Sequence, residues 1–457
     1  MAVRSALEQR WLRQVKNLPL VDVHWRYSRA PRLNDPVQGW KIHVSATPLS
    51  AGEVFSRVSP ILFRRDLLFK VPVRLELLAH VNMGIPAFSQ IGKFITVYPR
   101  STAEAVDLAR RLRTATRELP GPEIPFDVSY GKRSLVYYRY GSFRRSGKGS
   151  PADGVIIDLA GRSHPDRRAS GHAVPRWLSD PFQKSRGQSD RTHVGAALGP
   201  DYIPFKVISQ RGKGGVYEAV DLSVSPARLV IIKEGRKHGE TNWDSQDGYA
   251  RIKHEGRVLR DLRAAGLPVP EVIREFSWNR NRYLVLEKIP GRSLLPTHQK
   301  NPVKSSWRRA QRILDRLGAL LSILHAAGWV WRDCKPSHVL IRKGEMSLID
   351  FEGACPVNET QVPPWSSPNY SPLGYDKIFS RLAGHLEDDY ALGIIAFQFA
   401  TGQLPSLSRR GRAGPYKRAG VPGFFRDNVE RLLRFNRRND STGTSDRRNP
   451  ALYRPRG

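Results

Sequence analysis

The chain has 457 residues, 40% hydrophobic and 26% charged, and its 75 Lys and Arg against 42 Asp and Glu give a formal net charge of +33. This length allows two or three domains, each with its own core. No run of about 18 apolar residues exists to cross a membrane as a helix, and the first residues hold no apolar signal core. We therefore expect a cytoplasmic protein without a membrane partner.

The positive charge would attract nucleic acids, acidic peptides and phosphates alike. We expect no nucleic-acid partner, because zinc-finger spacing and aromatic–glycine RNA motifs are absent and the arginines are spread along the whole chain. Nucleic-acid binding is kept as a minor alternative. The two cysteines, Cys334 and Cys355, lie beside a pair of acids that would form a moving site, so we expect reduced thiols.

Residues 1–143 are predicted to form an α+β domain. Hydrophobic periodicity predicts helices at 5–18, 51–62 and 101–119, and strands at 40–45, 69–73, 91–99 and 134–143. Alternation along the first strand places Lys41 and His43 on one face. Taken singly, Lys41 or Lys93 would be interpreted as part of a solvated sheet face or as a charge that prevents edge-to-edge strand pairing.

Four motifs found in order favour a functional interpretation: Lys41-Ile42-His43, Phe69-Lys70, the run 92–99 (Gly-Lys-Phe-Ile-Thr-Val-Tyr-Pro) and Tyr138-Arg139-Tyr140-Gly141. With them, the segment resembles the phosphoserine/phosphothreonine lyase domain of class III and class IV lanthipeptide synthetases. The resemblance implies that Lys70 is the base for the Cα proton and His43 the acid for the leaving phosphate. Lys41, Lys93 and Arg139 would bind the phosphate, and the clustered cations would depress the pKa of Lys70.

Residues 144–200, rich in Arg, Ser, Gly and Pro, are predicted to be a linker with one ordered piece near 155–159. Residues 201–435 then begin with strands predicted at 205–208, 216–220 and 229–233, with a Gly-containing turn after the first. The third strand carries Lys233, and Glu255 begins a helical pattern.

Two acids, Asp333 and Asp350, stand 17 positions apart in the stretch 328–352. Between them the pattern is loop, strand, tight turn and strand, so each acid adjoins one strand of a hairpin. Phosphoryl transfer from ATP needs one carboxylate to orient the attacking hydroxyl and another to hold magnesium.

This half of the chain resembles a bilobal Ser/Thr protein kinase. The resemblance makes Asp333 the catalytic aspartate, Lys335 the lysine of the catalytic loop and Asp350 a metal ligand. Lys233 would bind ATP with Glu255 as its partner, or Glu240 instead; Gly214, in a sparse Gly-rich loop, and Glu287, in the hinge strand, would line the nucleotide. Asp388 matches the kinase aspartate that holds the catalytic loop in place.

The match has departures. Trp331 replaces the usual His, Glu352 replaces a Gly, and His338 stands where kinases place the Asn that holds a second metal. An imidazole is a poor magnesium ligand, so the expected cofactors are ATP and Mg²⁺, with Mn²⁺ as an alternative.

The expected activity is that of a dehydratase. It would phosphorylate Ser or Thr of a ribosomal precursor peptide, with an acidic leader, and then eliminate phosphate. The Arg-rich tail 436–457 is predicted to be disordered, and no cyclase domain is found, so a separate cyclase would close rings. The alternatives are a plain Ser/Thr kinase with a peptide-binding N-terminal domain, and a non-catalytic pseudokinase module.

Overall fold

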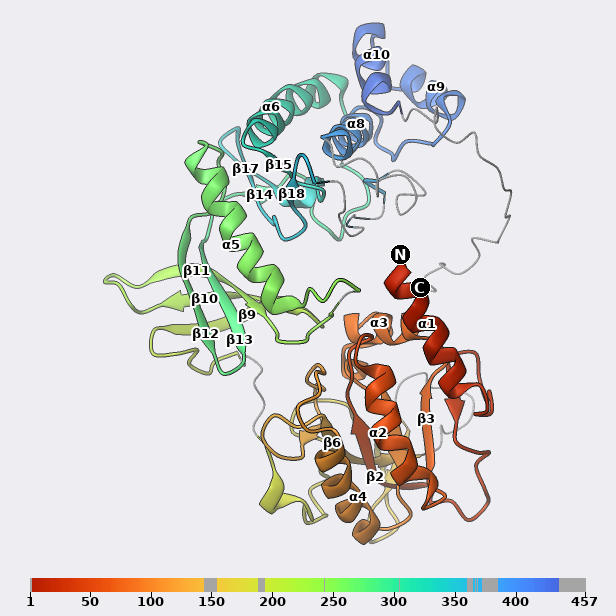
Figure 1. The fold of residues 1–457 in the computed structure, drawn as a ribbon. Helices are drawn as coiled ribbons and strands as arrows, with labels where there is room; N and C mark the ends of the chain where they lie inside the picture. Colours follow the sequence, from red (N-terminus) through yellow and green to blue (C-terminus); the bar gives the residue numbers. More distant parts are fainter. Residues whose placement is uncertain are drawn as a thin grey trace. The chain divides into compact units, whose positions relative to one another are not determined.

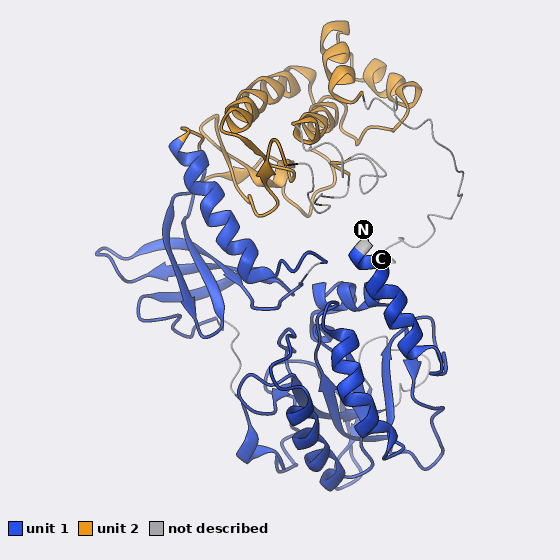
Figure 2. Cartoon of the chain, viewed as in Figure 1, with its two compact units in different colours: residues 1–264, 269–289 blue, residues 265–268, 290–457 orange. Residues whose placement is uncertain are grey.

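The computed structural model describes residues 2–143, 154–187, 194–241, 243–303, 305–359, 365, 367, 369–371 and 385–434. The chain divides into two compact units, residues 1–264 with 269–289 and residues 265–268 with 290–457 (Figure 2). In the described part of the chain no helix is long and apolar enough to span a bilayer. The tail 436–457 lies outside the described residues.

The first unit begins with an antiparallel six-stranded sheet in the order β1-β3-β4-β2-β6-β5 (Figure 1). The strands are β1 (Trp25–Tyr27), β2 (Gln38–Val44), β3 (Leu68–Pro72), β4 (Ile95–Tyr98), β5 (Val128–Ser129) and β6 (Val136–Ser142). The helices are α1 (Ala2–Val15), α2 (Ala51–Phe63), α3 (Leu75–Met83) and α4 (Thr102–Ala115). Helices α2 and α4 pack together over one sheet face.

Side-chain alternation along β2 determines what the two sheet faces carry. Ile42 and Val44 are fully buried in the core shared with the helices. Because neighbouring residues of a strand project to opposite faces, Lys41 and His43 point away from that core. The alternation that packs the apolar residues of β2 against the helices therefore also places its basic residues on the other side of the sheet.

Part of the predicted linker is ordered on this domain. Strands β7 (Val155–Ile157) and β8 (Ser163–Pro165) form an antiparallel hairpin. The amide of Gln38 in β2 donates to the carbonyl of Ile157 at 2.8 Å and accepts from its N–H at 2.6 Å. The ordered piece expected near 155–159 corresponds to β7, and the Gln38 side chain ties it to β2.

The rest of the first unit is a second antiparallel sheet in the order β12-β13-β11-β10-β9, with one helix packed on it (Figure 1). Its elements are β9 (Tyr202–Arg211), β10 (Gly214–Asp221), β11 (Arg228–Gly235), α5 (Gly248–Ala264), β12 (Val272–Trp278) and β13 (Asn281–Glu287). Helix α5 contacts β11 and β13, so side chains of α5 can reach the strand that carries Lys233.

The second unit is mainly helical. Helix α8 contacts α6, α9 and α10, and small sheets β14-β16-β17 and β15-β18 complete the unit. The helices are α6 (Trp307–Ala326), α8 (Leu386–Thr401), α9 (Arg409–Arg418) and α10 (Gly423–Leu432). The strands are β14 (Arg292–Ser293), β15 (Trp329–Val330), β16 (Val339–Arg342), β17 (Glu345–Leu348) and β18 (Cys355–Pro356).

Helix α3 was not predicted, and two further helices differ from the prediction. Glu255 lies inside α5, which begins seven residues earlier at Gly248, not at its start. Helix α9 is absent from the prediction because its sequence holds two glycines and a proline, which disfavour helix. Tertiary contacts override that preference: buried Arg412 pairs with Glu430 of α10 at 2.6 Å, and Tyr416 is also buried.

Candidate active sites

A cluster of basic side chains lies on the face of the first sheet opposite α2 and α4. Lys41 pairs with Arg139 across β2 and β6, and His43 pairs with Thr96 of β4. Directly paired residues project to the same side of a sheet. Lys93, just before β4, acts electrostatically on both Lys41 and His43. The structure thus brings Lys41, His43, Lys93 and Arg139 together, and all four are buried.

The first of two buried carboxylates in this cluster is Asp127, which the sequence did not reveal as a site residue. Its side chain lies 2.5 Å from His43 Nδ1 and accepts from Lys93 Nζ at 3.2 Å. An isolated acid 84 positions from its histidine partner carries no motif. Only its place immediately before β5 could have suggested that it reaches the sheet.

The second carboxylate, Asp166, comes from the chain just after the β7–β8 hairpin. It accepts from an Arg139 guanidinium nitrogen at 2.5 Å and lies 4.0 Å from Lys41 Nζ. It also accepts from the backbone N–H of Ser142 at 3.0 Å. The glycine at 141 permits this approach, since a β-carbon there would come 2.8 Å from an Asp166 oxygen.

Burial and mutual repulsion alter the protonation of this cluster. Burial, together with the repulsion of neighbouring cations, lowers the pKa of Lys41 to about 7 and that of Lys93 to about 8. Burial also lowers the pKa of His43 to about 3, although Asp127 opposes this shift. Burial acts to raise the pKa of Asp127, but the charges of Lys93 and His43 outweigh it and hold that pKa low. A neutral His43 therefore donates its Nδ1–H to the Asp127 carboxylate.

Lys70 lies on the same sheet face but further from the cluster. It pairs with Thr96 across β3 and β4, and Thr96 pairs with His43, so the three side chains share one side. Two inter-strand steps separate the Lys70 and His43 backbones by roughly 10 Å. The Lys70 ammonium lies 4.3 Å from the centre of the Trp25 ring, a cation–π distance.

In the second part of the first unit, Lys233 and Glu255 form a buried ion pair. Lys233 Nζ donates to the Glu255 carboxylate at 2.6 Å, and Glu255 is fully buried. The alternative partner, Glu240, pairs with Arg251 at 3.2 Å. An ion pair of this kind holds a kinase lysine in position for nucleotide phosphates.

The two other residues expected near the nucleotide lie in the same sheet. Gly214 begins β10, where a β-carbon would overlap the carbonyl oxygen of Glu234. Glu287 ends β13, and its backbone N–H donates to the Glu271 carbonyl at 3.0 Å. Glycine at 214 is therefore required by close packing against β11.

The second unit holds the loop with Asp333, and Asp388 of α8 fixes its backbone. The Asp388 carboxylate accepts from the N–H groups of Trp331 and Arg332, both at 2.8 Å, and lies 3.0 Å from His325 Nε2. The Trp331 indole N–H donates to the Asp350 carbonyl at 2.9 Å. The tryptophan at this position thus links the loop to the chain just after β17.

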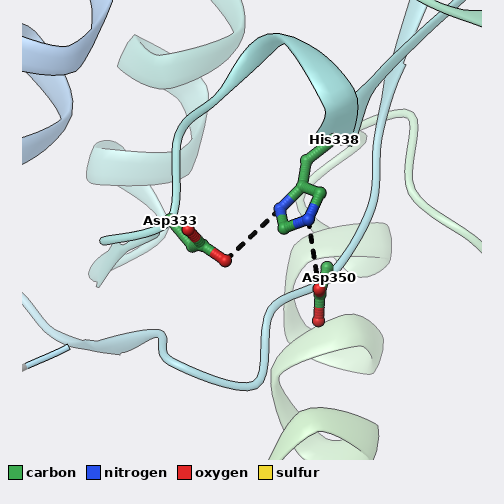
Figure 3. A group of neighbouring side chains, drawn as sticks. All are labelled: Asp333, His338 and Asp350. Atoms are coloured by element: carbon green, nitrogen blue, oxygen red, sulfur yellow. Dashed lines mark ion pairs between the residues drawn. The ribbon is translucent and has the colours of Figure 1, made fainter. Parts of the chain in front are cut away.

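Asp333, His338 and Asp350 converge on one point (Figure 3). His338, at the end of a short 3₁₀ turn (Pro336–His338), lies between the acids, 3.5 Å from Asp333 and 3.2 Å from Asp350. One ligand atom from each lies within 4.8 Å of the others. Two carboxylates and an imidazole fit a divalent cation, and the nitrogen ligand suits a transition metal better than magnesium.

Ser367 is a site residue that the sequence did not single out. Its hydroxyl donates to Asp333 at 2.5 Å and accepts from Lys335 Nζ at 2.7 Å, while Lys335 also donates to Asp333 at 3.0 Å. A hydroxyl can therefore bind between this acid and this lysine. Ser367 stands 34 positions after Asp333, and no motif around it in the sequence indicates this contact.

Two family models match successive parts of the chain. The RamC N-terminal domain matches residues 2–194, and the lipopolysaccharide kinase (Kdo/WaaP) family matches residues 211–374. The first match covers the β7–β8 hairpin, and it also covers the two carboxylates Asp127 and Asp166. The chain thus carries a kinase-family domain after a RamC-type N-terminal domain.

The curated relatives include a synthase and several serine/threonine-protein kinases. A probable SapB synthase of Streptomyces coelicolor is 31% identical over 358 residues, covering 73% of this chain and 37% of that protein. The serine/threonine-protein kinase PknA of Mycobacterium tuberculosis is 30% identical over 224 residues, 46% of this chain and 49% of PknA. A probable PknB kinase of Lactococcus lactis is 28% identical over 210 residues, 44% and 32% respectively. The chain spans at most half the length of these relatives, and the matches fit a lanthipeptide-synthetase-like protein with a kinase-like C-terminal part.

Proposed function

We propose that this chain dehydrates Ser and Thr residues of a ribosomal precursor peptide in two steps. The kinase-family domain transfers phosphate from ATP to the side-chain hydroxyl. The N-terminal domain then removes the Cα proton and expels phosphate, which leaves dehydroalanine or dehydrobutyrine. The similarity to a probable SapB synthase and to serine/threonine-protein kinases supports this combination.

One observation carries the proposal: the buried cationic site of the N-terminal domain. Lys41, Lys93 and Arg139 are each at most 8% exposed, and among the described residues the carboxylates paired with them are Asp127 and Asp166. Burying unbalanced charge costs stability unless a ligand compensates it. A phosphate monoester, which is a dianion at neutral pH, supplies the missing negative charge.

The elimination needs one proton acceptor and one donor. Lys70 is the proposed acceptor of the Cα proton, and the electron pair of that C–H bond forms the C=C bond as the C–O bond to phosphate breaks. His43 is the proposed donor to the departing oxygen. A bound dianion favours the imidazolium, which opposes the burial that holds the pKa of His43 low.

In the kinase step, Asp333 is the proposed acceptor of the hydroxyl proton, and Lys335 binds the hydroxyl oxygen. The contacts of Ser367 with both residues support these roles. Lys233 and Glu255 would hold ATP, with backbone groups at Gly214 and Glu287. Asp350, with His338, would hold the magnesium or manganese ion, which neutralises phosphate charge when bound.

Crossed variants test the two steps. With ATP and a Ser/Thr-containing precursor peptide, the wild type should produce a mass loss of one water. Lys70→Ala should accumulate the phosphorylated peptide, because loss of a proton-transfer group typically slows a step about 10²–10⁴-fold. Asp350→Ala should leave that peptide unmodified but still release phosphate from a synthetic phosphoserine peptide.

Lys132→Ala is the matched control for Lys70→Ala, because Lys132 is an exposed lysine of the same domain. It should dehydrate as the wild type does. A wild type that phosphorylates the peptide but never eliminates phosphate would instead be a plain kinase. A wild type that binds no nucleotide would be a pseudokinase module.

A further inference from the structure

Arg168 reaches the basic cluster from the segment predicted as a linker. The backbone there is held firmly: the Asp166 N–H donates to the Gly154 carbonyl at 2.7 Å, and Arg139 donates to the Arg167 carbonyl at 3.0 Å. Asp166 and Arg139 are joined by an ion pair, so residues 166–168 are fixed beside the cluster from two sides.

The charge of Arg168 acts on the cluster itself. It lowers the pKa of both Lys41 and Lys93, and the residue directly follows Arg167, whose carbonyl accepts from Arg139. The two nearby carboxylates contact other groups: Asp127 bonds His43 and Lys93, and Asp166 bonds Arg139.

The Arg168 side chain also has unused donor capacity. Its Nε is buried and has no hydrogen-bond partner among the described residues. A buried guanidinium N–H without an acceptor costs roughly 1–3 kcal/mol or more. An arginine fork matches the spacing of two phosphate oxygens, which an approaching ligand would supply.

We infer that Arg168 is a further phosphate-binding residue of the N-terminal site, supplied by the β7–β8 segment and not by the sheet. This inference rests on the proposed elimination. Four cations, Lys41, Lys93, Arg139 and Arg168, then face two carboxylates, Asp127 and Asp166. When both lysines are protonated, the excess of two positive charges balances the two negative charges of a phosphate monoester dianion.

Arg168→Ala tests the inference on the full chain, with Arg167→Ala as the matched control. Arg167 is the exposed neighbour, and only its carbonyl contacts the site. Two assays are used: calorimetry gives the Kd for inorganic phosphate, and phosphate release from a synthetic phosphoserine peptide gives KM and kcat. A third variant, Arg168→Lys, keeps the charge and removes the fork.

We expect Arg168→Ala to raise Kd and KM about 10- to 100-fold, since charge-assisted hydrogen bonds contribute about 1.5–3 kcal/mol each. kcat should change less, and Arg168→Lys should recover part of the affinity. Arg167→Ala should match the wild type. Circular dichroism on each variant verifies the fold.

The outcomes separate the inference from the proposed function. If Lys41→Ala impairs phosphate release while Arg168→Ala equals Arg167→Ala, the elimination stands and the role of Arg168 is refuted. If the wild type neither binds phosphate nor releases it from the phosphopeptide, both fail. If Arg168→Ala lowers kcat with KM unchanged, the residue does not act by binding phosphate.

Discussion

Replacing Asp388 by Asn probes how the catalytic loop is held. The carboxylate is fully buried and accepts three hydrogen bonds, from the backbone N–H groups of Trp331 and Arg332 and from the His325 ring. An asparagine has one oxygen, so it can serve one backbone N–H, while its amide NH₂ faces the other. The substitution therefore changes hydrogen bonding without removing volume.

The expected cost follows from these contacts. One buried N–H is left without an acceptor, which costs about 1–3 kcal/mol. The remaining bond changes from charge-assisted to neutral, which removes about 1 kcal/mol more. Asp388→Asn should thus destabilise the second unit by about 2–4 kcal/mol, a large share of the roughly 5–15 kcal/mol that stabilises a typical domain.

Urea unfolding followed by tryptophan fluorescence measures this change as a lowered midpoint, with the slope of the transition compared between variants. The control is Asp389→Asn at the next position. Asp389 is half-buried, and burial raises its pKa, so removing its charge should be neutral or slightly stabilising. If Asp388→Asn shifted stability by less than about 0.5 kcal/mol, or no more than Asp389→Asn, the carboxylate would not brace the loop.

Three further outcomes are expected. As pH rises through about 7 to 8, Lys41 and Lys93 lose charge in the empty site, so kcat/KM for phosphate release from a phosphopeptide should fall. Lys41→Arg should move that decline to higher pH. A flat profile up to pH 9 would contradict the lowered pKa values. His338→Asn should raise kinase activity with magnesium relative to manganese, because an amide oxygen suits a hard cation better; titrating both metals against both forms checks this, and an unchanged ratio would mean that His338 is not a ligand. Affinity for an acidic leader peptide should fall as salt rises, because the +33 charge acts only over roughly 8 Å at physiological ionic strength; a salt-independent Kd would favour an apolar groove.

Local sequence was sufficient for the kinase loop and for half of the basic cluster. Asp333 and Asp350 adjoin one hairpin whose register follows from strand alternation and a tight turn, so their proximity is a local property. The same period of two places Lys41 and His43 on one face of β2. Hydrophobic periodicity also located most helices to within a few residues, because the buried face of each helix repeats along the chain.

The remaining charged groups of the basic cluster are brought together by the tertiary structure alone. Asp127, Asp166 and Arg168 are single charged residues in irregular chain, and a residue without a period or a neighbouring motif carries no signal of its destination. The positions of Asp166 and Arg168 depend on the β7–β8 hairpin docking on β2, which is set by contacts between residues more than a hundred positions apart. Asp127 lies 84 positions from the histidine that it contacts. For the same reason the charge balance of the site, and with it the fit to a phosphate dianion, follows from long-range packing and not from the sequence pattern.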